Sequence, residues 1–331
     1  MTQKISKTST IMSWTDRHIL LYKKRKMMNN NVREIINWQV VSIVLLLIFS
    51  NKIYAQEGKH DFFGLTYGYQ KINSDSAKGN IKKIDAFLNF PIYRSEEEMS
   101  GGRLQFKSKN ISGLAPSISK DLYSTDLFVF WQSKIKEKYK VYVFAQLGVY
   151  SDLKDLNGED FRYSLGARYT IQHNDNLKTG WGISYSRQFF GHQLNPFISV
   201  DYQITPKLRL SGLLPIRPKL TYFINENLSW TNEVVANAAS YRLSAQEENS
   251  RFIRINNWYG MSSLEYRLGG SHKLSIGLGY DFTNSIRLYD DTTANNWSIF
   301  TFDLRQKIHP VQEVRSKGLR FEIGYSFDLQ K

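Results

Sequence analysis

Strict alternation of apolar and polar residues is the feature that most constrains the fold of this chain. Residues 318–331 read GLRFEIGYSFDLQK, and every second residue from Phe321 is large and apolar. These positions are Phe321, Ile323, Tyr325, Phe327 and Leu329. The residues between them are polar or small, so the two faces of the segment prefer opposite solvents. The pattern predicts a β-strand with one face toward an apolar medium and the other toward water.

The same period-two pattern recurs along most of the chain. Segments 161–172 and 177–188 alternate in this way and are joined by the turn-forming HNDN at 173–176, which predicts a hairpin. A second hairpin is predicted around Gly269 and Gly270, and its following strand carries the apolar residues Leu274, Ile276, Leu278, Tyr280 and Phe282. Repeated alternating segments of about ten residues, separated by turn residues, are typical of transmembrane β-barrels.

Fifteen strands follow from this segmentation, but a single-chain bacterial barrel has an even number. We therefore predict an all-β, transmembrane, antiparallel up-and-down β-barrel of about 14 strands, with 12 as the next choice. The doubtful segments are 211–220 and 307–318, where Pro215, Pro218 and Pro310 interrupt the pattern. The other predicted strands are 62–72, 81–93, 101–109, 121–133, 139–150, 196–204, 207–213, 217–224, 227–237, 252–267 and 296–306.

A soluble, exported β-sandwich is the alternative that needs no membrane. It would have to bury the apolar faces of some fourteen strands, whereas the opposite faces here carry Gly, Ser, Thr and mixed charge, as a wet lumen requires. The short turns at 205–206 and 225–227 suit the periplasmic side of a barrel, and the longer polar segments suit external loops. These longer segments are 73–80, 151–160, 238–250 and 290–295.

The N-terminal segment predicts export. Basic residues at 23–26 precede the ten-residue apolar run VVSIVLLLIF at 40–49, which is too short to span a bilayer as a helix. We predict a signal peptide over 27–55, cleaved between Ala55 and Gln56, with 1–26 as an upstream start assigned in error. An uncleaved N-terminal anchor is the alternative. The barrel domain is then 56–331, in the outer membrane.

Composition narrows the function. The chain has no cysteine, which excludes thiolate metal sites, disulfides and cysteine nucleophiles. Residues 1–55 hold nine basic and two acidic residues, a net charge of +7, so the formal charge of +14 falls to 14 − 7 = +7 for 56–331. The remaining basic residues are scattered along strands, so no nucleic-acid partner is expected. The expected partners are outer-membrane lipid, the barrel-insertion machinery and small solutes.

Residues 211–243 resemble the central block of an uncharacterised family of Gram-negative outer-membrane barrels, catalogued as a domain of unknown function. The resemblance continues from Leu264 and would cover most of 60–331; it implies the fold and the location, and no activity. The C-terminal strand, with Phe321, Ile323, Tyr325 and Phe327, also resembles the assembly signal of such barrels. The resembling central positions are Leu213, Leu214, Pro215, Leu220, Tyr222, Leu228, Tyr241, Arg242 and Leu243.

Charged residues on the predicted inner face are the candidate lining of a lumen. As a function they would form an electrostatic lining that mildly favours anions. As a structural feature they would form a network of cross-strand ion pairs that braces the barrel, and this is at least as well supported. The candidates are Arg162, Arg168, Lys178, Lys273, Asp281, Arg320 and Glu322.

Neither a metal site nor a catalytic motif is apparent. The histidines have no ligand partner at a short interval on one strand face, and we expect no cofactor. His192 lies near Ser184, Ser186 and Asn195, which invites a hydrolase hypothesis, but no nucleophile motif supports it. We predict a non-enzymatic barrel, first a passive pore or transport barrel for small solutes. The alternative is a plugged structural or interaction barrel that acts through its outer loops, chiefly 238–250.

Overall fold

The computed structural model describes residues 61–74, 77–249, 251–269, 271–290, 296–304 and 309–328. The predicted signal peptide and its cleavage site between Ala55 and Gln56 lie outside these residues, so they stay predictions. Within the described ranges, no helix is both long and apolar enough to cross a membrane.

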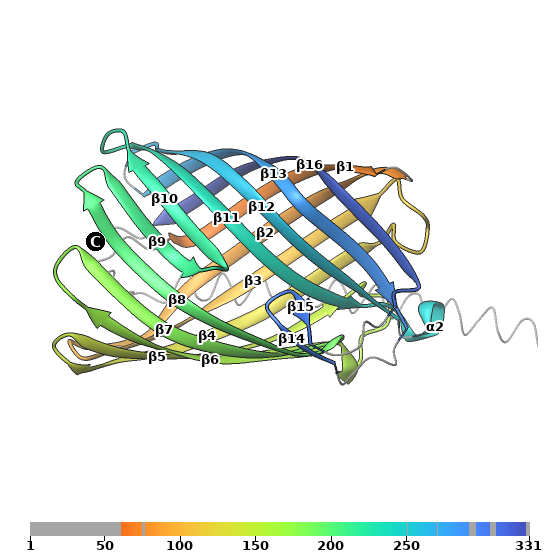
Figure 1. Cartoon of the computed structure of the whole chain (residues 1–331), viewed down its shortest axis with the longest axis horizontal. Coiled ribbons are helices and arrows are strands. Elements are labelled where there is room, and N and C mark those ends of the chain that lie inside the picture. Colours follow the sequence, from red (N-terminus) through yellow and green to blue (C-terminus); the bar gives the residue numbers. More distant parts are fainter. Residues whose placement is uncertain are drawn as a thin grey trace, which may run out of the picture. The chain divides into compact units, whose positions relative to one another are not determined.

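Fourteen antiparallel strands of the described chain form a closed barrel, which confirms the predicted fold and strand number (Figure 1). Strands β1 to β13 pair with their sequence neighbours, and β16 closes the barrel by pairing with both β13 and β1. The first seven are β1 (Asp61–Ser74), β2 (Ala77–Arg94), β3 (Glu98–Ser112), β4 (Asp121–Lys136), β5 (Tyr139–Ser151), β6 (Phe161–Gln172) and β7 (Leu177–Gln188). The others are β8 (Gly191–Thr205), β9 (Leu208–Leu214), β10 (Arg217–Phe223), β11 (Leu228–Arg242), β12 (Phe252–Arg267), β13 (His272–Tyr289) and β16 (Gln312–Asp328).

The surplus strand of the sequence prediction is segment 296–306. It forms two short strands, β14 (Trp297–Ile299) and β15 (Phe302–Asp303), and β14 pairs in parallel with the start of β8 (Figure 1). The segments that proline made doubtful belong to the wall instead. Pro215 lies in the turn between β9 and β10, and Pro310 precedes β16, so neither removes a hydrogen bond from the middle of a ladder.

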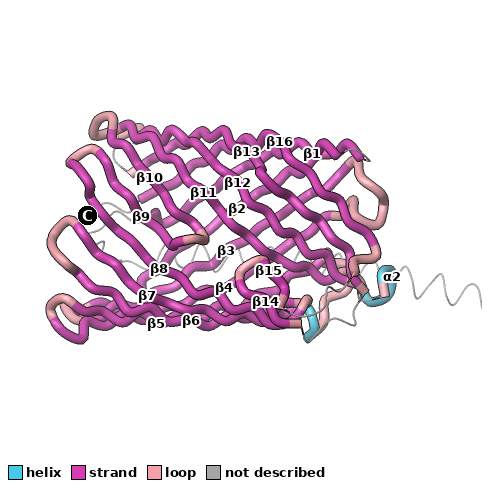
Figure 2. Tube along the Cα trace, viewed as in Figure 1, coloured by secondary structure: helices cyan, strands magenta, loops and turns pink. Residues whose placement is uncertain are grey.

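The two ends of the barrel differ in their connections. Strands β1 and β16 start and finish at the same end, which we call the terminus end, where the other connections are two to four residues long. Asn174 and Asn225 build two of these turns, since each side-chain oxygen accepts hydrogen bonds from the backbone two and three residues later. The opposite, loop end holds the longer connections and two short helices of the described residues, η1 (Gly158–Asp160) and α2 (Ala245–Glu248) (Figure 2).

The outer face of the wall is apolar. Leu165, Trp181 and Ile276 keep 53%, 63% and 50% of their surface exposed, and residues of the same kind continue around the barrel. An exposed apolar surface this extensive is unstable in water and suits lipid. The alternating residues between them face the lumen, as the period-two pattern predicted.

At the loop end, β11 loses its partner β10 but stays paired with β12 as far as Arg242 and Phe252. Its pairing with β10 stops at Glu233, and its last residue, Arg242, pairs in parallel with Ser151 of β5, although five wall strands separate β5 from β11. The predicted loop at 238–250 is therefore wrong in its first five residues, which continue the strand. The end of β11 packs into an apolar cluster inside the loop end of the barrel. That cluster comprises Ile72, Ile81, Ile111, Ile118, Leu122, Tyr150, Ala239, Tyr241, Leu243, Ile253, Ile255, Ile286, Leu288 and Val314.

Segment β14–β15 covers the part of the wall where β11 no longer has β10 as a neighbour. Arg254 of β12 is almost fully buried and forms an ion pair with Asp303, with 2.8 Å between Nη1 and Oδ1. From the other side, Gln193 Nε2 of β8 donates to the backbone oxygen of Phe300. The hairpin is thus bound to β12 on one side and to β8 on the other.

Candidate functional site

One side of the lumen carries arginines that lie over aromatic rings. The three guanidinium groups come from β3 and β6, and the rings come from β2 and β5. We call these six residues the cation–aromatic face. Its pairs are Arg103 over Phe87 at 4.5 Å, Arg162 over Tyr150 at 3.8 Å and Arg168 over Tyr142 at 4.7 Å, each from the guanidinium carbon to the ring centroid.

The arginines of this face lack acidic partners. In the described ranges, no carboxylate oxygen lies within 4.0 Å of the guanidinium nitrogens of Arg103, Arg162 or Arg168. Arg103 Nε donates to the side-chain oxygen of Asn89 at 2.7 Å, and Arg162 Nη1 donates to the backbone oxygen of Ser240 at 2.7 Å. The Nε atoms of Arg162 and Arg168 are buried without a hydrogen-bond acceptor. Because no carboxylate of the described residues pairs with these guanidinium groups, they are candidates to bind an anionic ligand.

Further aromatic rings lie flat against this part of the wall. The Phe144 ring covers Gly166 on the next strand, and the Phe197 ring covers Gly182, so closely that a Cβ at either glycine would come within 2.3 Å of the ring. Glycine is required at both positions because any side chain would lift the ring off the wall. The Phe144 ring therefore adds aromatic surface to the lumen without extending across it, whereas the Phe197 ring is buried against the wall.

The other side of the lumen is ion-paired. Arg320 of β16 pairs with Asp281 of β13 at 3.0 Å, and Glu322 of β16 pairs with Lys83 of β2. Arg217 of β10 makes two hydrogen bonds to Glu233 of β11, at 2.8 and 2.9 Å. We call these six residues the ion-paired face. Opposite charges on neighbouring strands stabilise one another here and brace the wall.

The predicted lumen-lining residues divide between these two sides. Arg162 and Arg168 belong to the cation–aromatic face, and Asp281, Arg320 and Glu322 belong to the ion-paired face. Lys273 pairs with Asp61 and Asp328 at the terminus end, and Lys178 is exposed opposite Asp201 in the pairing of β7 with β8. Contact of any of these residues with a solute stays a prediction.

Sequence reasoning missed Arg103, Arg217, Glu233 and the inward path of β11. Arg103 could have been predicted as a lining residue, because it lies on the inner face of a predicted strand, in phase with Lys107 and Lys109. The contact of Arg103 with an aromatic ring could not be predicted, because Phe87 belongs to the preceding strand and its position depends on the register of β2 and β3.

His192 is not positioned to activate a serine. It lies at the start of β8 and not in a loop, its Nδ1 is 2.8 Å from the Tyr185 hydroxyl, and Arg187 Nη1 is 2.9 Å from its Nε2. Ser184 and Ser186 are in phase with the lumen, whereas His192 is in phase with the outer face and stacks on Trp297. In the described part of the chain, no group of three or more His, Asp or Glu side chains is arranged to hold a metal ion.

Polar contacts surround the closed loop end. Lys154 pairs with Glu247 and Lys120 with Glu248, which ties α2 to two neighbouring loops. The Asp152 carboxylate accepts hydrogen bonds from the backbone of Lys154 and Ser244. Burial of Asp152 outweighs these bonds and raises the pKa of its carboxyl above the ordinary value.

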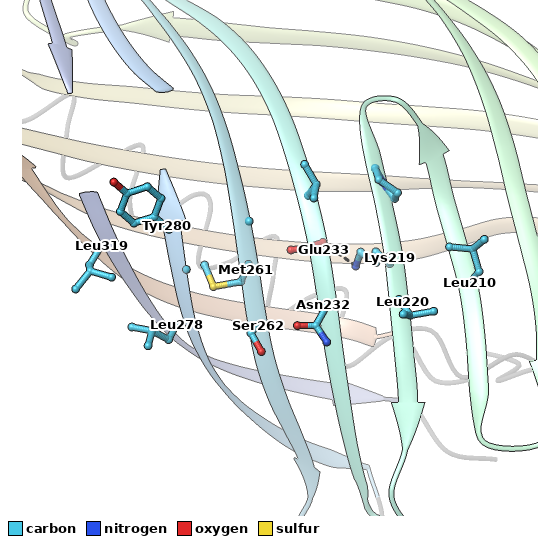
Figure 3. Close-up of a pocket in the computed structure, with 14 residues that line it drawn as sticks. Leu210, Lys219, Leu220, Asn232, Glu233, Met261, Ser262, Leu278, Tyr280 and Leu319 are labelled. Carbon is cyan, nitrogen blue, oxygen red and sulfur yellow. Dashed lines mark ion pairs between the residues drawn. The ribbon is translucent and has the colours of Figure 1, made fainter. Parts of the chain in front are cut away.

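A groove of about 560 Å³ lies on the outer face, across β9 to β13 and β16 (Figure 3). Apolar side chains such as Leu220, Leu278 and Leu319 border it, and Gly260 and Gly279 form part of its floor. Lys219 and Glu233, which Figure 3 shows joined as an ion pair, point to the lumen side of the same strands. The groove therefore belongs to the apolar outer surface and is separate from the lumen.

Comparison with solved structures returns outer-membrane barrels at low similarity. An outer-membrane channel from Pseudomonas putida F1 described as COG4313 has 10% identity and a TM-score of 0.43, over 85% of this chain and 99% of that one. The NanC porin has 10% identity and a TM-score of 0.36, over 81% and 100%. Outer membrane phospholipase A from Escherichia coli has 10% identity and a TM-score of 0.35, over 82% of this chain and 98% of that one. These values are too low to transfer a function.

No curated protein matches the chain. A family model described as "Domain of unknown function (DUF6268)" matches residues 51–309, which include most of the wall strands and the arginines of the cation–aromatic face. The match covers well over half of the sequence, so the chain belongs to the DUF6268 family.

Proposed function

We propose that the protein is an outer-membrane channel for small solutes that is held closed at its loop end by β11. The observation that carries this proposal is the path of β11, which loses its pairing with β10 after Glu233 and, still paired with β12, reaches Ser151 of the opposite wall through Arg242. The pairing with β5 is the link that has to break, so the paired ends of β11 and β12 can move together and open the mouth without unfolding the barrel. The outer-membrane location rests on the apolar outer face and on the predicted signal peptide.

The ladder with β12 and a few side chains hold the end of β11 in place. Tyr241 is almost fully buried, with its ring 5.9 Å from the Tyr150 ring and 5.1 Å from Lys109 Nζ. Ser240 accepts hydrogen bonds through its backbone oxygen from Arg162 and through its hydroxyl from the backbone of Phe189. These contacts make Tyr241 the largest apolar side chain that anchors the closure.

The test is the single-channel conductance of the membrane-purified protein, wild type against Tyr241→Ala. Truncating a buried aromatic residue costs roughly 3 kcal/mol, which would shift a closed-to-open equilibrium by on the order of 100-fold. We expect rare openings in the wild type and frequent, ohmic openings in the variant. Tyr163→Ala is the matched control, because Tyr163 is an exposed residue of the outer face. Silence of Tyr241→Ala, in a barrel shown to be folded by its heat-modifiable migration, would reject the channel.

A plugged interaction barrel is the second candidate, favoured by the ion pairs that fix the outer loops. Lys154 with Glu247 and Lys120 with Glu248 hold α2 against the loops that precede β6 and β4. A barrel that serves through such a fixed surface would stay silent in both variants. Hydrolase activity has no comparable support, since His192 and the nearby serines lie on opposite faces of the wall.

A further inference from the structure

The arginines of the cation–aromatic face have a recognition chemistry that the ion-paired face lacks. An arginine stacked on a ring exposes the edge of its guanidinium group, and that edge can donate two parallel hydrogen bonds to a carboxylate. Arg320 and Arg217 already use this edge to donate hydrogen bonds to the carboxylates of Asp281 and Glu233. Arg168 makes no such bond to a carboxylate in the described structure.

The carboxylates near these arginines accept hydrogen bonds from neutral glutamine side chains. Asp85 accepts a hydrogen bond from Gln105 Nε2 at 2.7 Å, and Asp126 accepts one from Gln146 Nε2. The same wall carries Lys107 and Lys109 in phase with Arg103. Together with the three arginines these cations outnumber the carboxylates Asp85 and Asp126, so the positive potential of this part of the lumen is incompletely compensated, which favours an anion.

The surroundings of the arginines specify more than charge. Each arginine lies on an aromatic ring, and the ring of Phe144, which is only partly buried, extends the same wall. A planar, apolar solute can stack on such rings while its carboxylate meets a guanidinium edge. A small inorganic anion would use the charge and leave the aromatic surface unused.

We propose that the cation–aromatic face is the binding path for small aromatic carboxylates, with Arg103, Arg168 and Arg162 as successive carboxylate contacts. The proposal rests on the channel function proposed above and names its substrate class. Arg162 is the contact next to the closure, because its present partner is the backbone oxygen of Ser240 on β11. A carboxylate is a stronger acceptor than a neutral carbonyl, so a solute at Arg162 would compete with the closing strand.

The permeability ratio of benzoate to acetate, measured from bi-ionic reversal potentials across a planar bilayer, tests the proposal. Benzoate is the larger and slower anion, so a plain water-filled pore gives a ratio below one. We expect a ratio above one for the wild type, recorded in the Tyr241→Ala background if openings are rare. The neutral Arg168→Gln variant should lower the ratio at least threefold, and Arg168→Lys, which keeps the charge but loses the planar fork, should fall between them.

Arg209→Gln is the matched control, because Arg209 also faces the lumen but pairs with Asp201. It should leave the benzoate-to-acetate ratio unchanged. A wild-type ratio below one, or equal ratios in Arg168→Gln and Arg209→Gln, would overturn the proposal.

Binding without conduction separates this proposal from the channel function. If every variant is silent, the urea-unfolding midpoint of the full-length protein is measured with benzoate, with acetate and with cyclohexanecarboxylate, which has the charge without the flat ring. A ligand that binds the folded state alone raises that midpoint. A rise specific to benzoate and lost in Arg168→Gln supports the binding path although the channel fails. Equal effects of all three anions would reject it.

Discussion

The phase of a residue within its strand decides its surroundings. Ser184 and His192 are eight residues apart in the sequence and lie on paired strands, yet their side chains belong to opposite faces of the wall. A shift of one position along either strand would exchange lipid for lumen. Proximity in the sequence therefore does not show that two side chains of a barrel can form a catalytic group. Their alternation within the strands does show whether they lie on the same face.

Burial separates arginines that look alike in the sequence. The Arg320 and Asp281 side chains keep 6% and 0% of their surface exposed, whereas those of Arg209 and Asp201 keep 44% and 39%. Replacing Arg320 by Ala leaves a carboxylate buried without a partner, which costs roughly 3–5 kcal/mol. Replacing Arg209 by Ala breaks an exposed pair and should cost about 0–1 kcal/mol.

Reversible urea unfolding in detergent checks this difference between Arg320→Ala and Arg209→Ala. Arg320→Met with Asp281→Leu is the informative double variant, because it removes the buried carboxylate together with its partner and should recover most of the lost stability. Equal losses for the two single variants would contradict the assignment of Arg320 to a buried pair.

At the scale of elements, the final strand shows how much of a strand's orientation the alternating pattern predicts. Strand β16 places Phe321 and Ile323 on the exposed outer face, and Tyr325 and Phe327 contact His272 of β13 near the terminus end. The sequence predicted this strand, the hairpin of β6 and β7, and the turn at 173–176, because alternation and turn chemistry agree there.

The role of β16 in assembly is testable through Phe327. Phe327→Asp puts a charge beside His272 on the apolar face and should lower the folded fraction in the membrane several-fold, seen as loss of heat-modifiable migration. Ser326→Asp is the matched control, since Ser326 faces the lumen and pairs with Gly64. Equal assembly of both variants would show that the aromatic residue is not part of an assembly signal.

Other elements could not be predicted because their conformation depends on distant strands. The end of β11 reads as a polar loop, but both of its faces are buried, by the apolar cluster and by neighbouring segments. Segment 296–306 alternates like a wall strand, yet the wall is already complete without it, and five of its described residues, 296–304, form strands. Sequence periodicity indicates whether each face of a strand meets an apolar or an aqueous medium. It carries no information about which strand turns inward.

The closure formed by β11 is expected to respond to pH through Asp152. The pKa of Asp152 is raised by burial in the closed state, so the closed state binds a proton more tightly than an open, hydrated loop does. Closure is therefore strengthened as the pH falls through that raised pKa. We expect the open probability to fall between about pH 7 and pH 4 and to lose most of this dependence in Asp152→Asn. An unchanged pH profile in Asp152→Asn would assign the effect to another group.

At the scale of the whole molecule, barrel closure brings the two sides of the lumen together. Lys83 and Glu322 are 239 residues apart in the sequence, and they meet because β16 closes on β1 beside β2. Individual lining residues could be predicted from strand phase, but their pairing could not, since it depends on strand number and register. The division into an ion-paired face and a cation–aromatic face is therefore a property of the assembled barrel.

The most direct measurement is the single-channel conductance of a barrel in which β11 is locked to β5. Ser151→Cys with Arg242→Cys joins the two residues that pair across the closed mouth, and the chain contains no other cysteine that could compete. The oxidised double variant should be silent, and a reductant should restore its openings, while each single variant should be insensitive to the reductant. Equal conductance before and after reduction, with the disulfide verified by mass spectrometry, would contradict the claim that β11 closes the channel.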